Sequence, residues 1–140
     1  MNEKYVTNLE LSKALKEIGC PQVSEFYWVD IGDKRFSENK EYWVLVDADC
    51  ASARKSNGKG TDIQCSAYLS DELLEMLPKI IDKFSLLIRY KDWGEWEVSY
   101  TIFEIGLSHS DIKWWERDKS LPIALVKILL YLHKEGLVKW

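Results

Sequence analysis

The sequence has few of the features that mark a secreted, membrane or duplex-DNA-binding protein. It contains three cysteines, Cys20, Cys50 and Cys65, and this odd, widely spaced set argues against a disulfide framework and favours reduced thiols. The longest apolar run, LPIALVKILLYL, has about twelve residues and contains Lys127, so it is too short to cross a bilayer. The formal net charge of −4 lacks the basic excess expected of a duplex-DNA-binding protein.

The first residues, MNEKYVTNLELSK, are polar and lack the apolar segment of a signal peptide. Together with the reduced thiols, this pattern predicts a cytoplasmic location and no membrane partner.

The sequence does contain enough apolar material for a core. Of its 140 residues 46% are hydrophobic and 13% aromatic, which is sufficient for one domain spanning residues 1–140. Apolar residues at helical spacing predict helices over 9–18, from Ser70 and from about Ser120. We expect Thr7 and Glu10 to form a capping box at the first helix, and Gly136 to end the last one in a Schellman motif.

Between these helices, runs rich in aromatic and β-branched residues predict strands: SEFYWVD, KEYWVLVD, FSLLIRY and WEVSYTIF. The polar stretch 49–64, DCASARKSNGKGTDIQ, predicts a mobile loop. The predicted order is α-β-β-α-β-β-(β)-α, which favours a single α+β domain with an antiparallel sheet layered with helices. Because residues alternate along the last long strand, we expect Glu95, Glu97 and Glu104 to be solvated on or beside its polar face.

Three stretches of the chain resemble, in order, blocks of a family of small phage- and prophage-encoded proteins: LSKALKEIGCPQVSEFYWVD, SAYLSDELLEMLP and SLPIALVKILLYLHKEGL. This family is similar to the so-called phage ABA-sandwich proteins, in which a sheet lies between helical layers. The blocks cover most of the chain, and residues 49–64 and 104–119 match least. They consist of core and capping residues. The resemblance therefore implies a fold and a phage-derived protein acting in the bacterial cytoplasm, but no catalytic residue.

No motif for chemistry stands out. The cysteines and the two histidines, His109 and His133, lack the paired spacing of zinc ligands, so we expect no metal and no cofactor. In LSHSD, contiguous residues are poorly suited to triad geometry, and no G-x-S-x-G elbow is present. We therefore predict no catalytic residue and no enzymatic activity. A hydrolase using Asp47, Asp49 and Asp62 with a divalent ion is a third, weaker hypothesis.

Phosphate binding is suggested by RKSNGKGT at 54–61, where Arg54, Lys55 and Lys59 supply charge and glycines let backbone amides approach an anion. The segment lacks Walker A spacing, and a solvated flexible loop is the alternative interpretation.

Seven tryptophans are a high number for this length. Trp93 lies in a predicted turn, where an indole has little protein around it. In DIKWWERD an extended backbone would send Trp114 and Trp115 to opposite faces. One ring would then complete the core, and the other would stand outward between Lys113, Glu116 and Arg117 as a contact residue or a base-stacking ring. The alternative, that both rings only fill the core, is equally compatible with the sequence.

These patterns predict a non-enzymatic binding or regulatory protein that contacts a host or phage protein and modulates a host process or defence. Its candidate binding residues are Trp93, Lys113, Trp115, Arg117, Arg54, Lys55 and Lys59. The alternative is a nucleotide or nucleic-acid binder that uses the basic 54–59 loop and an exposed tryptophan, or another small anionic ligand at that loop. A homodimer is compatible with either hypothesis if VLVD or TIF lies at a sheet edge.

Overall fold

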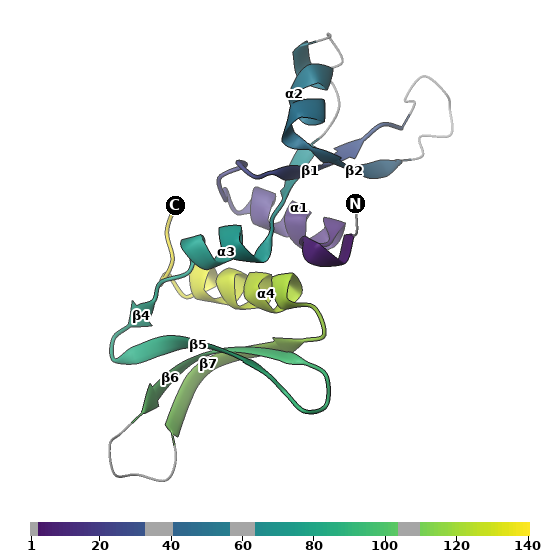
Figure 1. The fold of residues 1–140 in the computed structure, drawn as a ribbon. Coiled ribbons are helices and arrows are strands. Elements are labelled where there is room, and N and C mark those ends of the chain that lie inside the picture. The colour runs from purple at the N-terminus through teal and green to yellow at the C-terminus, as the bar shows by residue number, and fades with distance from the viewer. Residues whose placement is uncertain (1–2, 33–40, 57–63, 104–109) are drawn as a thin grey trace. The chain divides into compact units, whose positions relative to one another are not determined.

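The computed structural model describes residues 3–32, 41–56, 64–103 and 110–140, and only the backbone of 53–56, 103, 110 and 111. The fold is α+β, as predicted, and its strands form two antiparallel sheets of three and four strands rather than one (Figure 1). Contacts divide the chain into two compact units, residues 1–69 and 70–140. Among the described residues, no helix is long and apolar enough to cross a membrane.

The first unit contains a three-stranded sheet with the order β2-β1-β3 and helices on its two sides (Figure 1). Its elements are the 3-10 helix η1 (Glu3–Tyr5), α1 (Leu9–Glu17), β1 (Phe26–Asp30), β2 (Trp43–Asp47), α2 (Ala48–Ser56) and β3 (Gln64–Ala67). Helix α1 contacts β3, whereas α2 contacts β1 and β2. One face of this sheet carries an apolar cluster built around Val6, Trp28, Cys65 and Ala67.

The predicted helix at 9–18 is confirmed, but its cap differs from the prediction. Asn8 is the N-cap, and its side chain accepts a hydrogen bond from the amide of Leu11. The Thr7 hydroxyl instead accepts a hydrogen bond from the buried amide of Tyr68 at 3.0 Å, so it links the start of the helix to the segment after β3. As expected, Gly19 follows the C-cap Ile18 in the left-handed conformation, with a φ of 83° that glycine adopts at little cost.

Helix α2 lies where the sequence predicted the start of a polar loop. Residues 48–56 are helical, and the Oδ1 of Asp47 accepts a hydrogen bond from the amide of Cys50 at 2.8 Å. Asp47 therefore satisfies one of the free amides at the helix start, as an N-terminal cap does. The helix lacks a strong apolar stripe, which is why periodicity did not reveal it. Residues 57–63 lie outside the described residues, and the mobility of the 49–64 segment stays a prediction.

The second unit contains the four-stranded sheet β4-β5-β6-β7, with α3 and α4 on one side of it (Figure 1). Its elements are α3 (Ser70–Met76), β4 (Ile80–Ile81), β5 (Phe84–Tyr90), β6 (Trp96–Phe103), β7 (Ser110–Asp118) and α4 (Leu121–Lys134). Strands β5 and β6 have the predicted bounds, and β7 is the third strand that the sequence left optional. Helix α4 contacts α3, β6 and β7.

Helix α4 carries the apolar side of this unit. Leu125, Ile128 and Leu129 are buried, as their spacing predicts. The predicted Schellman motif is present: the Gly136 amide donates to the carbonyl of His133, and the Leu137 amide donates to the carbonyl of Leu132. The helix packs on β6 through residues of the Val98 and Tyr100 face, and the Tyr100 hydroxyl donates to the carbonyl of Pro78 at 2.7 Å.

Candidate functional site

The face of the four-stranded sheet turned away from α3 and α4 is called here the outer face. Its defining residues are Arg89 of β5, Lys91 directly after β5, the turn residue Trp93, Glu97 of β6, and Trp115 and Arg117 of β7. No described element of the second unit packs on it (Figure 1). The residues of β6 on this face are nevertheless buried, because larger side chains of β5 and β7 flank them. Ser99, for example, lies in register between Leu87 and Trp115.

Trp93 is presented by the turn between β5 and β6. The amide of Gly94 donates to the carbonyl of Lys91, and the amide of Lys91 donates to the carbonyl of Glu95. Gly94 has a φ of 90°, so this is a three-residue hairpin turn of the kind that ends in a left-handed glycine. The indole of Trp93 is 59% exposed, and its Nε1 donates to the Glu95 carboxylate at 2.7 Å. The turn therefore holds an aromatic ring in solvent.

The two adjacent tryptophans of β7 point to opposite sides of the sheet. Trp114 pairs with Tyr100 and makes edge-to-face contacts with the rings of Tyr100 and Phe84 at 6.0 and 5.8 Å. Trp115 pairs with Ser99 on the outer face and is 52% exposed. The prediction of one inward and one outward ring is confirmed, and Trp115 is the outward one.

Glu97 lies at the centre of the outer face, and its carboxylate is only 2% exposed. Its Oε1 accepts from Arg89 at 2.9 Å and lies 3.4 Å from the Lys91 ammonium, and its Oε2 accepts from Arg117 at 2.8 Å. The expectation that Glu97 is solvated is wrong, because Arg89 and Arg117 on the neighbouring strands and Lys91 directly after β5 converge on it. Glu104 lies outside the described residues.

The charge state of Glu97 follows from these contacts. Burial raises the pKa of Glu97, but the hydrogen bonds from Arg117 and Arg89 and the charge of Lys91 outweigh burial, so the pKa lies below its usual value. The carboxylate is therefore ionised at neutral pH. One negative charge is held under three positive ones, and a second carboxylate, that of Glu95, lies beside Trp93.

Arg117 joins the two exposed indoles. Its Cζ atom lies 5.4 Å from the ring centroid of Trp93 and 4.7 Å from that of Trp115. The Lys91 ammonium also lies 5.7 Å from the Trp93 ring. Cation–π attraction of this kind is strongest with tryptophan. Because Glu97 fixes the guanidinium from below, the two rings and the cation form one ordered group.

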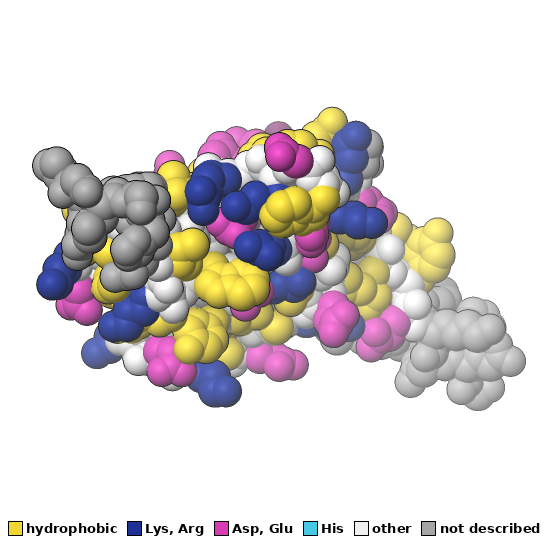
Figure 2. Space-filling view, turned by 90° about the horizontal axis from the view of Figure 1, so that it is seen from below, with side chains coloured by type: hydrophobic (Ala, Val, Ile, Leu, Met, Phe, Trp, Pro, Cys, Tyr) yellow, Lys and Arg dark blue, Asp and Glu magenta, His cyan; other side chains and the backbone are white. Residues whose placement is uncertain are grey.

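The space-filling view from the side of this sheet shows Lys and Arg side chains gathered among hydrophobic ones over the strands (Figure 2). Arg89 is 41% and Arg117 38% exposed, so both cations are accessible from solvent while they bind Glu97. The arrangement can bind a partner through aromatic surface and positive charge at once.

The predicted binding residues fall into three groups. Trp93, Trp115 and Arg117 come together on the outer face. Lys113 does not join them: it is the extra residue of a bulge in β7, and its ammonium lies 4.7 Å from the ring of the inward Trp114. Arg54 and Lys55 lie in α2, in the first unit, with side chains outside the described part, and Lys59 lies wholly outside it.

Sequence reasoning missed Arg89 and Lys91 as members of the site. Register supplies the missing information, since Arg89 lies opposite Glu97 and Glu97 opposite Arg117 across the strands. Had the sequence located β7, the alternation of side chains along the strands would have predicted a row of opposite charges across β5, β6 and β7.

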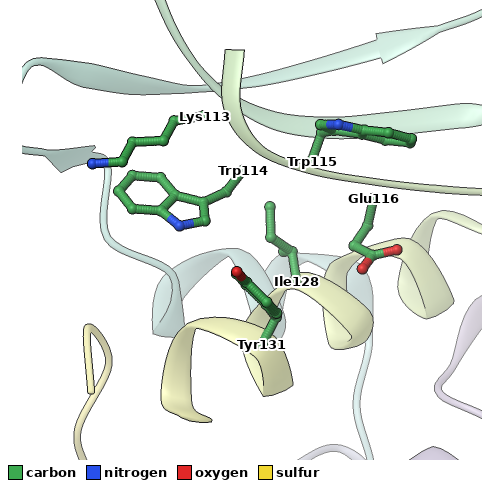
Figure 3. A pocket seen from close by; sticks show the side chains of 6 residues that line it. All are labelled: Lys113, Trp114, Trp115, Glu116, Ile128 and Tyr131. Carbon is green, nitrogen blue, oxygen red and sulfur yellow. The ribbon is translucent and has the colours of Figure 1, made fainter. Parts of the chain in front are cut away.

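A cavity of about 190 Å³ lies on the other side of β7, between that strand and α4. Its lining residues are Lys113, Trp114, Trp115, Glu116, Ile128 and Tyr131 (Figure 3). In this view Ile128 and Tyr131 rise from α4 toward the Trp114 ring, and Trp115 lies on the far side of the strand (Figure 3). Three of these lining side chains, Lys113, Glu116 and Tyr131, are ionisable.

Within the described ranges, no group of three or more His, Cys, Asp or Glu side chains could hold a metal ion. Asp47 is engaged with the start of α2, and Asp62 lies outside the described residues.

Of the segments considered for edge pairing in a homodimer, 44–47 lies in β2, an edge strand, whereas 101–103 lies in β6, which is central. The homodimer stays a prediction.

The chain matches no protein-family model, no curated protein and no solved structure.

Proposed function

We propose that this chain is a non-enzymatic accessory protein that acts by binding a negatively charged macromolecule through the outer face. The observation that carries the proposal is the Trp93–Arg117–Trp115 group, ordered over the buried carboxylate of Glu97. The resemblance to phage proteins supports a phage or prophage origin and a role in adjusting a host process or defence in the bacterial cytoplasm.

Exposure of the two indoles supports a contact role rather than a packing role. A tryptophan that only fills space stabilises the fold by removing its apolar surface from water. When more than half of the side chain stays exposed, most of that stabilisation is lost. Trp93 and Trp115 are both more than half exposed although Trp114, the neighbour of Trp115, is packed between rings. Tryptophan and arginine are also the residues most enriched among the energetically dominant contacts of interfaces.

Charge supports an anionic partner. The chain has a formal net charge of −4, yet three cations meet on the outer face, against the buried carboxylate of Glu97 and the Glu95 carboxylate that binds Trp93. A positive patch on a negatively charged protein steers an anionic partner to that patch and repels it elsewhere.

The test is quantitative affinity capture from phage-infected bacterial lysate, with proteins and nucleic acids both analysed. Three baits are compared: the wild-type chain, the double variant Trp93→Ala/Trp115→Ala and the control Tyr131→Ala. Tyr131 is also an exposed aromatic residue of the second unit, but it lies on α4. We expect a partner that wild type and the Tyr131 variant retain and the double variant loses. Identical capture by all three baits would overturn the proposal.

A further inference from the structure

We infer that the anionic partner of the outer face is single-stranded nucleic acid, whose bases stack on Trp93 and Trp115 while its phosphates meet Arg89, Lys91 and Arg117. This inference rests on the proposed function, because it names the partner class of the same surface. It does not involve residues 54–59, which belong to the other unit.

Ring geometry carries the first step. The ring centroids of Trp93 and Trp115 lie 5.4 and 4.7 Å from the Cζ atom of Arg117, so two exposed aromatic rings flank one guanidinium on one sheet face. Every base has a π-face, and unpaired bases stack on exposed aromatic rings and arginine planes of open sheets. Two platforms with an arginine between them suit a site of about two or three nucleotides.

Charge carries the second step. Arg89 and Arg117 each donate one hydrogen bond to Glu97, and a guanidinium has five N–H donors in all. Both side chains are therefore able to bind a phosphate oxygen without releasing Glu97. The carboxylate beneath them fixes the guanidinium planes, which reduces the conformational entropy lost when a phosphate binds.

A duplex fits this surface less well than a single strand. Bases in a duplex are stacked on each other, so the two indoles would have no ring faces to meet. Duplex binding would then rest on charge alone, and the patch has only three cations in a chain with a net charge of −4. An acidic protein surface would match the charge but would leave the paired stacking platforms without flat aromatic partners.

The experiment is fluorescence anisotropy with the purified full chain and four fluorescein-labelled probes. These are a ten-residue oligothymidylate, a ten-residue oligouridylate, a ten-base-pair A·T duplex and poly-L-glutamate. The variants are Trp93→Ala, Trp115→Ala and Trp115→Phe, with Tyr131→Ala as the control, each checked for folding by circular dichroism. The two oligonucleotides distinguish DNA from RNA as the source of the shared base and phosphate chemistry.

We expect at least one single-stranded probe to bind more tightly than the duplex. Each alanine variant should weaken that binding by about 5- to 100-fold, the phenylalanine variant should weaken it less, and Tyr131→Ala should leave it unchanged. With three phosphates contacted, the logarithm of the binding constant should fall against log salt with a slope of about −2.

Three kinds of result overturn the inference. If only poly-L-glutamate binds, and the tryptophan variants lose it, the partner is an acidic polypeptide and the proposed function stands. If no probe binds, or if the alanine variants bind as the wild type does, both the inference and the anionic-partner proposal fail. Duplex binding as tight as single-strand binding also overturns the inference, since stacking would then contribute nothing.

Discussion

Neutralising Glu97 should destabilise the second unit, and Glu97→Gln is the substitution that isolates the charge. Glutamine keeps the shape of the side chain, but its NH₂ group would face guanidinium and ammonium donors that need an acceptor. Removing one partner of a fully buried ion pair costs about 3–5 kcal/mol, whereas exposed pairs contribute about 0–1 kcal/mol. Glu97 is buried but its arginine partners are about 40% exposed and can turn to water. We therefore expect a loss of about 2 kcal/mol.

The assay is urea unfolding at pH 7, with the free energy of unfolding obtained by linear extrapolation. Glu75→Gln, at an exposed position of α3, is the control, for which a change within about 0.5 kcal/mol is expected. If Glu97→Gln changes the free energy as little as the control does, the carboxylate does not hold the three cations, and the ordering of Arg117 between the indoles loses its basis.

The same substitution predicts a pH dependence. The pKa of Glu97 is lower in the folded chain than its ordinary value of 4.5, so the folded state favours the ionised form. The stabilisation is then fully present above about pH 4.5 and is lost as the pH falls through the lowered folded pKa. The difference in stability between wild type and Glu97→Gln should therefore be constant between pH 6 and 8 and should narrow below pH 4.5. A difference that widens in acid would contradict the assignment.

Three further predictions concern the cores and a thiol. Leu125→Ala in α4 should cost about 2–5 kcal/mol in urea unfolding, while Ile80→Ala at an exposed position should cost little. Trp28→Phe removes the donor that binds the buried carbonyl of Thr7 at 2.9 Å and should cost about 1–3 kcal/mol, and a negligible loss would show that the bond contributes nothing. Burial raises the pKa of the Cys65 thiol to about 11, so at pH 8 it should react with Ellman's reagent only when denaturant is added, and prompt reaction of all three thiols without denaturant would contradict its burial.

The local elements could be predicted from the sequence where side-chain period and end signals agree. The bounds of β5 and β6 follow from alternation, and the last helix follows from its apolar stripe and from Gly136. Helix α2 could not be found in this way, because its side chains carry no apolar period and its start depends on the capping of Cys50 by Asp47.

The division of the strands into two sheets depends on contacts between distant segments, which the alternation of side chains along a strand does not predict. Strand β3 is only four residues long, and its residues are buried on both faces, so QCSA shows no alternation. The candidate site was predictable in part. Adjacent tryptophans indicated one outward ring, whereas the burial of Glu97 depends on the register of β5 and β7 against β6, which a single strand pattern does not specify.

The alternation of Trp114 and Trp115 has a consequence for how β7 can change. The strand carries a packing ring and a contact ring at consecutive positions, so a shift of one residue in their pairing with β6 would exchange their roles. The bulge at Lys113 absorbs one extra residue, so that Ile112 stays opposite Thr101 and Trp114 stays opposite Tyr100. If the bulge were lost and Lys113 kept, the start of β7 would present its side chains to the opposite face, while both indoles would stay in place. A change at this position therefore alters one rim of the outer face without disturbing its two tryptophans.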